Sequence, residues 1–275
     1  MSVLSRRYAG VIGAYEIWPE ANIAAHWSTA EGISPERYTE LLRQASLAIH
    51  SADPFAIVIS GGLAPTGAND EIHVIDDLSF YQRMYTAGAA NYFDALGVRV
   101  DGYNNPPGDT PEFSTVATQN YKGHTSFYFR HYEAVRAIML ANNNAEKNIW
   151  LTSVGWATMS YRSPEIDYAA DVTEQQQASY LAEALAQAQA QPYISLIFIN
   201  NFNFSTLANA PAQQAAYSLI RADWSARPAF TTLAQLRQGN AFAQQMPNPN
   251  ATAAPLRILP NWQPRLRYLF QPRQP

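Results

Sequence analysis

Glu20 stands just after an apolar run near the start of the chain, in the sequence YEIWPEAN at residues 15–22. A carboxyl group delivered by a buried strand to an open surface is suited to general acid or base chemistry. Such chemistry needs further groups opposite the first, so Glu20 has to be judged together with the elements that would position them. The alternative is that Glu20 remains from a site that has lost its other parts.

Five apolar runs rich in β-branched and aromatic residues are predicted to form buried strands. They span residues 11–18, 55–60, 93–100, 148–154 and 194–200. The segments between them carry helix signals, such as Ser34-Pro35 and Asp76-Asp77 at two helix starts. Because strand and helix alternate, we predict an α/β fold with a mainly parallel sheet, covered on both faces. The longest irregular segments follow strands, where α/β proteins build their sites.

Composition excludes several classes of protein. The chain has 275 residues, 47% of them hydrophobic, with a net charge of −4 and no cysteine. It is long enough for a sizeable core, has no broad basic surface for nucleic acid, and has neither disulfides nor thiolate metal ligands. There is no long apolar run and no signal-peptide pattern, so we expect a soluble chain without a membrane span, of unknown location. Its five histidines show no metal-binding spacing, and we expect neither metal nor cofactor.

The order of these pieces resembles part of a clan A glycoside hydrolase, of the cellulase-like and xylosidase-like families. Those families typically read YEIWNEPN at the end of the fourth barrel strand, HPYG after the sixth, TEFGW at the seventh and a tryptophan at the eighth. In matching places this chain has YEIWPEAN, FDALGVRVDGY, IWLTSVGWAT and LIFINNFNF, between about Tyr8 and Leu236. The resemblance implies a TIM-barrel-like fold in which this chain covers strands four to eight.

Several positions depart from the pattern of these families. Glu20 matches their acid/base glutamate, whereas Ser153 stands at the position of the nucleophilic carboxylate. Pro19 replaces the usual asparagine, and Asn200 stands where an aromatic sugar platform is expected. Retaining hydrolysis needs two carboxyl groups about 5 Å apart, and an inverting enzyme needs a base about 6.5–9.5 Å from the acid. Asp101, in the segment that replaces HPYG, is the one nearby candidate for such a base.

These departures favour a protein derived from a glycoside hydrolase that has lost catalysis. Glu20 is then a relict acid/base, interpreted as a polar rim residue or an ion-pair partner of Arg99. The expected role is a structural or assembly subunit, or a carbohydrate-binding module. The alternative is an active glycosidase with rearranged carboxylates, in which Asp101 serves as the base.

Four residues are candidates for contact with a saccharide. Trp27, Tyr103 and Trp156 are predicted to lie on or near the loops that follow the strands, where aromatic rings stack on sugars, and Asn200 belongs to the eighth-strand position. Packing in the core or at the rim is the competing interpretation for each ring, and it is favoured for Trp156, which matches the GW of the family pattern.

The predicted organisation is a partial barrel at residues 1–238 and a tail rich in Pro, Asn and Arg at residues 239–275. A barrel closes with eight strands, so five would leave two open edges. Because an open edge promotes association, we expect a second copy, a partner protein or the tail to cover it. A fragment or a mis-assigned start is the alternative explanation of the missing strands.

Overall fold

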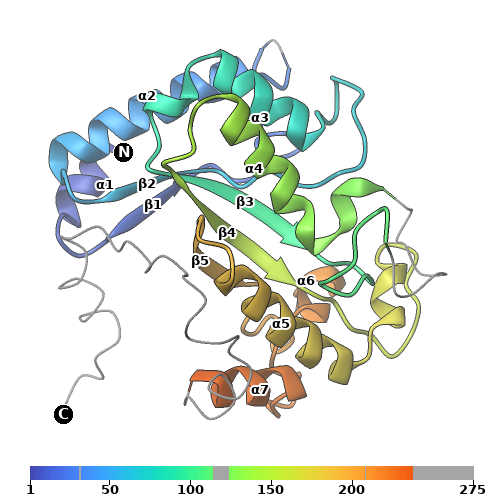
Figure 1. Ribbon diagram of the computed structural model, residues 1–275. Coiled ribbons are helices and arrows are strands. Elements are labelled where there is room, and N and C mark those ends of the chain that lie inside the picture. The colour runs from blue at the N-terminus through green and yellow to red at the C-terminus, as the bar shows by residue number, and fades with distance from the viewer. Residues whose placement is uncertain (31, 114–123, 208, 238–275) are drawn as a thin grey trace, which may run out of the picture.

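The computed structural model describes residues 1–30, 32–113, 124–207 and 209–237. Its centre is a five-stranded sheet in the order β1-β2-β3-β4-β5, in which all neighbouring strands are parallel (Figure 1). Each strand coincides with one of the predicted apolar runs to within a few residues. The strands are β1 Ala14–Ile17, β2 Ile57–Ser60, β3 Ala95–Asp101, β4 Asn148–Gly155 and β5 Ile194–Ile199.

Helices connect the strands in the predicted alternation. The α-helices are α1 Ser2–Arg7, α2 Pro35–Ala52, α3 Asp77–Thr86, α4 Tyr132–Ala141, α5 Glu174–Gln189, α6 Ala212–Ala216 and α7 Pro228–Arg237. Short 3-10 turns lie at Ala89–Asn91, Thr125–Phe127, Phe129–His131 and Asp167–Asp171. A parallel sheet joined by helical crossovers is the arrangement expected for part of a (β/α) barrel.

The helix starts follow the capping chemistry read from the sequence. The Ser34 side chain accepts a hydrogen bond from the Arg37 amide at the start of α2, and Asp76 caps α3 through the Ser79 amide. Thr173 opens α5 with a reciprocal capping box. These caps satisfy amides that have no partner within the helix, and so they fix where each helix begins.

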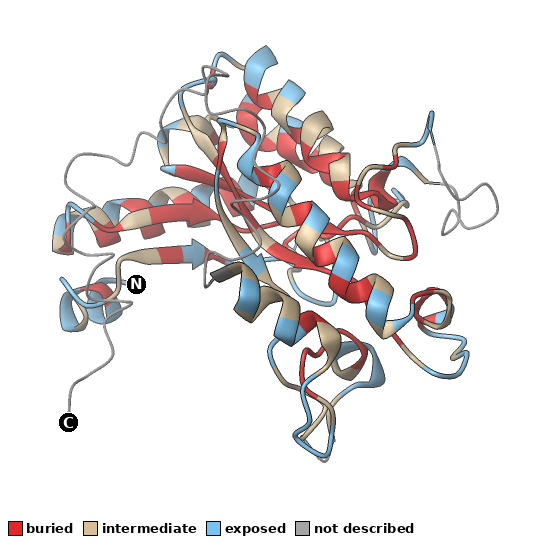
Figure 2. Cartoon of the chain, turned by 60° about the horizontal axis from the view of Figure 1, so that its bottom comes forward, coloured by how far each residue is buried: buried red, intermediate tan, exposed pale blue. Residues whose placement is uncertain are grey.

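The main core lies between the sheet and its helices. Leu96, Val98 and Val100 of β3 alternate into this core, where they join side chains such as Leu42 of α2 and Val135 of α4. Figure 2 shows the buried side of these helices turned toward the strands and the exposed side turned to solvent. Successive strand residues point to opposite faces, so the intervening β3 residues belong to the other face of the sheet.

That second face carries a smaller apolar cluster. Ile59, Ala95 and Trp150 are buried there, with Leu196 partly buried beside them. Phe198 of β5 is 48% exposed and its ring centroid is 6.3 Å from that of Trp150. We predicted strands covered on both faces; the described part of the chain supplies helical cover to one face and leaves the other only partly buried.

Two buried tyrosines tie the strand ends together. The Tyr38 hydroxyl donates to the Ile17 carbonyl at 2.7 Å and accepts from the Gly61 amide at 2.6 Å. The Tyr81 hydroxyl likewise donates to the Gly97 carbonyl at 2.7 Å and accepts from the Leu63 amide at 3.2 Å. Each hydroxyl thus bridges a strand and the segment that follows β2: Tyr38 reaches the end of β1, and Tyr81 reaches the middle of β3.

The protein therefore has an α/β fold that forms part of a TIM-type barrel. Within the described residues β1 and β5 each have a neighbour on one side only, as the count of five strands implied. The predicted tail at residues 239–275 lies outside the described residues. The described helices include none that is both long enough and apolar enough to span a bilayer.

Candidate functional site

The candidate site lies at the carboxyl ends of β1, β3 and β4. Glu20 follows β1 by a short loop, Arg99 and Asp101 are at the end of β3, and Ser153 is near the end of β4. The carboxyl ends of parallel strands share one edge of the sheet, so these residues come together although they are far apart in sequence.

A tight backbone turn presents Glu20. Trp18 and Glu20 both have positive φ angles, of 51° and 58°, which are uncommon for residues with a side chain. The Glu20 amide donates to the Gly62 carbonyl at 2.9 Å, which anchors this turn to the end of β2. The carboxylate is thereby aimed across the strand ends while its side chain stays 20% exposed.

Both carboxylate oxygens of Glu20 are engaged. Oε1 lies 3.0 Å from an Nη atom of Arg99, and Oε2 lies 2.6 Å from Nδ1 of His26. The side chain of His26 is 49% exposed, and that of Arg99 is 24% exposed. The ion pair between Glu20 and Arg99 that the sequence suggested is present. The contact with His26 was not predicted, because no spacing rule links a glutamate to a histidine six residues later in an irregular loop.

Asp101 is the second carboxyl group of the site. Burial raises its pKa to about 6, and the nearby charge of Glu20 acts in the same direction, while Arg99 and a hydrogen bond from the Gly155 amide oppose the shift. Arg99 and Asp101 are two residues apart on one strand, so they share a face of the sheet. The residue predicted as a candidate base is therefore close enough to Glu20 for their charges to interact, although it is only 9% exposed.

A bulge in β4 brings Ser153 beside Arg99. Val98 pairs with Leu151 and Arg99 pairs with Ser153, so Thr152 is an extra residue in β4. Ser153 is 3% exposed, and its hydroxyl has no hydrogen-bond partner among the described residues. Bulges of this kind re-aim side chains at functional sites. Here the re-aimed position carries a hydroxyl where the resembling families place a carboxylate.

Several buried polar atoms near Ser153 also lack partners within the described ranges. They are Nε of Arg99, Oδ1 of Asp101 and Oγ1 of Thr152. Buried polar atoms in native proteins usually find a partner, in the protein or in ordered water. Their concentration at the ends of β3 and β4 marks this place as polar and incompletely satisfied, which is typical of sites rather than of packed cores.

Two glycines after β2 make the close approach of these strand ends possible. A Cβ atom on Gly61 would lie 2.2 Å from the Trp18 carbonyl oxygen, and one on Gly62 would lie 2.3 Å from Oγ1 of Thr152. Gly61 and Gly62 thus lie where the irregular backbone after β2 passes close to its neighbours. The Gly62 amide also donates to Oε1 of Glu16 at 3.0 Å.

The predicted saccharide contacts occupy different environments. Trp27 is partly buried, with its ring centroid 5.6 Å from that of Trp18, and Tyr103 is partly buried and donates to the Pro65 carbonyl. Trp156 is fully buried and donates to the Asn105 carbonyl at 2.8 Å, which gives it a packing role. Asn200 is partly exposed after β5. Contact of Trp27, Tyr103 and Asn200 with a sugar stays a prediction, whereas Trp156 has no exposed surface for such a contact.

Trp18 is the aromatic residue that sequence reasoning missed. Its ring is 51% exposed, and its indole N–H donates to the His26 carbonyl at 3.0 Å. It stands two positions before Glu20, at the end of the first apolar run, and this adjacency was the signal that would have identified it. Among the described residues no group of three or more His, Asp or Glu side chains is placed to hold a metal ion.

Comparison with known proteins supports the fold. No protein-family model matches the chain, and a search of curated sequences found no match either. A glucosidase from Croceicoccus marinus has a similar structure, with a TM-score of 0.60, 16% identity, and coverage of 87% of this chain and 45% of that one. A family 39 glycoside hydrolase from Bacteroides cellulosilyticus WH2 gives a TM-score of 0.50, 16% identity, and coverage of 83% and 41%.

Native xylanase 10B from Thermotoga maritima is a further structural neighbour, with a TM-score of 0.51, 14% identity, and coverage of 86% of this chain and 64% of that one. The chain thus shares its fold with part of these glycoside hydrolase structures, and it spans less than half the length of the first two neighbours. At such identities the likeness concerns the fold, and function has to be argued from the site.

Proposed function

We propose that this protein derives from a glycoside hydrolase and binds carbohydrate at the Glu20–Arg99 surface without hydrolysing it. This surface consists of Trp18, Glu20, His26 and Arg99. The observation that carries the proposal is the double engagement of Glu20, with one carboxylate oxygen 3.0 Å from Arg99 and the other 2.6 Å from His26. A general acid has to present its carboxyl group to the leaving oxygen, whereas both carboxylate oxygens of Glu20 are already in contact with neighbouring side chains.

Loss of hydrolysis is also supported by what stands opposite Glu20. Double displacement requires a carboxylate that forms a glycosyl ester, and the residue that matches this position in the resembling families is Ser153, which pairs with Arg99 across the sheet. A serine hydroxyl would need an adjacent base to become a nucleophile. The Ser153 hydroxyl is buried and hydrogen-bonds to no such base among the described residues.

Carbohydrate binding is supported by the chemistry of the exposed part. An exposed indole lies next to a carboxylate, an imidazole and a guanidinium that are between 20% and 49% exposed. Aromatic rings pack on apolar C–H faces and charged groups hydrogen-bond hydroxyls, which together suit a polyhydroxylated ligand. The names of the structural neighbours, a glucosidase and a xylanase, point to the same class of ligand.

A role as one part of an assembly accompanies this binding function. β1 and β5 are edges of the described sheet, and the exposed Phe198 belongs to the face that a closed barrel would bury. An unpaired strand edge is a template for pairing with another segment. We infer that another copy, a partner protein or further polypeptide covers this side. Light scattering of the purified full chain tests the homo-oligomer, and co-purification tests the partner.

The binding proposal is tested by calorimetric titration of cello- and xylo-oligosaccharides into the purified chain. Binding should be weakened in Trp18→Ala and kept in Trp224→Ala, a matched control because Trp224 is 70% exposed and lies elsewhere, before α7. Stacking of a nucleobase on one aromatic ring is worth about 1–3 kcal/mol, and a similar value for a sugar would lower the affinity by about 5- to 150-fold. Equal affinity of both variants and the wild type would refute the proposed surface.

An active glycosidase with rearranged carboxylates is the second candidate. The observation in its favour is Asp101, whose pKa is raised to about 6 by burial and by the charge of Glu20. A buried carboxyl group with a raised pKa near a second carboxyl group is typical of hydrolase acid–base sites. Turnover of any oligosaccharide that disappears in both Glu20→Gln and Asp101→Asn would favour this candidate over the first.

A further inference from the structure

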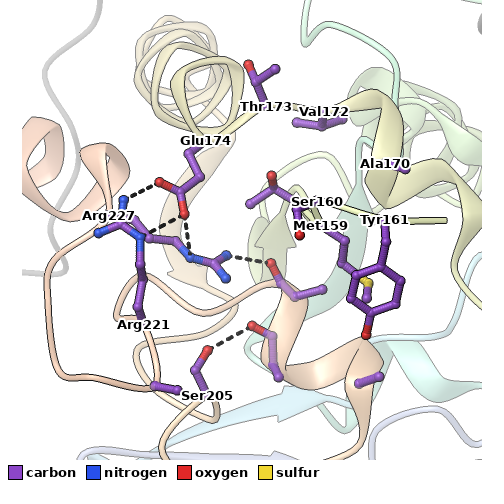
Figure 3. A pocket seen from close by; sticks show the side chains of 15 residues that line it. Met159, Ser160, Tyr161, Ala170, Val172, Thr173, Glu174, Ser205, Arg221 and Arg227 are labelled. Carbon is purple, nitrogen blue, oxygen red and sulfur yellow. Dashed lines mark hydrogen bonds and ion pairs between the residues drawn. The ribbon is translucent and has the colours of Figure 1, made fainter. Parts of the chain in front are cut away.

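A hollow lies away from Glu20, between the segments that follow β4 and β5. Its volume is about 600 Å³, within the range of small-molecule sites. The polar end is formed by Glu174, Arg221 and Arg227, and the opposite end includes Met159 and Tyr161 (Figure 3). A buried cluster around Tyr168 and Tyr217 packs behind it. The hollow is therefore distinct from the candidate site.

Two arginines and one carboxylate line the polar end, and Asp223, outside the lining, interacts with the charge of Arg221. Arg221 binds Glu174 with two of its nitrogens, one at 3.0 Å, and its remaining Nη atom donates to Ser225 and to the Ala226 carbonyl. Arg227 is left with a long contact of 3.4 Å between its Nε and the same carboxylate. Two guanidinium groups therefore share one carboxylate, and the lining holds no other charged residue among those described.

Arg227 is the less satisfied of the two arginines. Its side chain is 11% exposed, against 38% for Arg221, and Nε has no hydrogen-bond partner within the described residues. One Nη atom donates to the Ala216 carbonyl at 2.9 Å. Burying a charge without full pairing is unfavourable, and a second carboxylate beside this guanidinium would offset that cost.

The rest of the lining is apolar or carries hydroxyl groups. Met159, Tyr161 and Val172 supply the larger apolar surfaces, and small alanines leave the space between them open. Hydroxyls come from Thr158, Ser160, Thr173 and Ser205, of which Ser205 already donates to the Ala215 carbonyl. A ligand for this hollow thus needs one anionic end and a mainly apolar body.

We propose that this hollow is a binding site for a small organic monocarboxylate with an aromatic or branched aliphatic body, whose carboxylate pairs with Arg227. Planar guanidinium groups bind carboxylates with two parallel hydrogen bonds, which gives orientation as well as affinity. The ring or alkyl body then packs against Met159 and Tyr161. The site is independent of carbohydrate binding at Trp18, and it holds whether or not that function does.

Methionine-methyl NMR of the full chain tests the site directly. The chain has five methionines, and Met84 and Met139 are buried at 1% and 0% exposure in the main core as internal references. Phenylacetate should shift the Met159 methyl signal and leave those of Met84 and Met139 in place. The neutral benzyl alcohol should need about tenfold or more higher concentration, because it lacks the charge-assisted bonds.

Variants separate this site from unspecific binding. Arg227→Gln should weaken phenylacetate about tenfold or more, whereas Arg130→Gln should change nothing, since Arg130 pairs with Glu133 outside the hollow. Ala170→Leu fills the hollow without altering charge, and it should abolish the Met159 shift even if Arg227→Gln fails to fold. No shift with phenylacetate, benzoate or isovalerate overturns the proposal. So does a shift unchanged by both hollow variants, or binding of inorganic phosphate in place of the carboxylates.

Discussion

The carboxylate of Glu20 and the guanidinium of Arg99 lie 3.0 Å apart across the carboxyl ends of β1 and β3. Asp101 stands two residues further along β3 and interacts with both charges. The three groups form one electrostatic unit, in which a single cation serves two carboxyl groups. Such a unit changes its protonation when any member is replaced, and this makes it open to experiment.

Protonation of Asp101 should make the fold more stable in mild acid. Burial raises the folded pKa from 3.8 to about 6, so the folded state binds an additional proton between these values. This contribution is fully present below about pH 4 and is lost as the pH rises through about 6. At pH 8 Asp101→Asn should therefore be more stable than the wild type, by about 1–3 kcal/mol. Denaturant unfolding at pH 8 and pH 5 measures the difference.

The stability difference between Asp101→Asn and the wild type should shrink at pH 5, because the wild-type carboxyl group is then mostly protonated and carries little buried charge. A stability difference that is the same at both pH values would show that Asp101 does not titrate in this range. The wild type and Asp101→Asn both contain Glu20 and Arg99, so the ion pair between these residues does not confound the comparison.

Replacing the neighbours of Asp101 should move its pKa in opposite directions. The charge of Glu20 raises the pKa and that of Arg99 lowers it. Glu20→Gln should therefore lower the pKa of Asp101, and Arg99→Met should raise it. Carbon-detected NMR titration of the Asp101 carboxyl in each variant reads the shifts directly. Shifts of the same sign in both variants would contradict the proposed electrostatic unit.

A side chain added at Gly62 should disturb the candidate site, because it would press on Thr152 and Arg99. A Cβ atom there would lie 2.3 Å from Oγ1 of Thr152 and 2.8 Å from Cγ of Arg99, so these two buried side chains must shift to accept it. Overpacking of this kind typically costs about 1–3 kcal/mol, so Gly62→Ala should unfold at lower denaturant concentration. Gly108→Ala is the control, because its nearest neighbour is the mobile end of Glu183 at 3.3 Å. Equal stability of the two variants would be inconsistent with the close approach.

The sequence predicted the strands, the helix starts and the Glu20–Arg99 ion pair because each depends on local pattern or on strand order. Apolar runs identify buried strands, and Ser34 and Asp76 use short-range capping chemistry. Parallel strands then place Glu20 and Arg99 at one edge. The five-stranded sheet and its α/β class followed from the same reasoning.

The sequence did not predict the parts of the site that depend on irregular backbone. The positive φ angles at Trp18 and Glu20 turn the loop so that His26 contacts the carboxylate of Glu20. No periodic pattern in the sequence predicts such a turn. The extra residue Thr152 shifts the register of β4, which cannot be deduced from alternation alone. The pairing of Glu174 with Arg221 and Arg227 likewise joins distant loops that carry no recognisable spacing.

The most direct test is to incubate the chain with a saccharide that it binds and to follow the saccharide by mass spectrometry, beside Glu20→Gln. The account predicts that the bound saccharide stays intact with both proteins, because Glu20 contacts Arg99 and His26 and, in the proposal, a serine, Ser153, takes the place of the nucleophilic carboxylate. Cleavage by the wild type that disappears in Glu20→Gln would contradict it, and would identify Glu20 as a working acid.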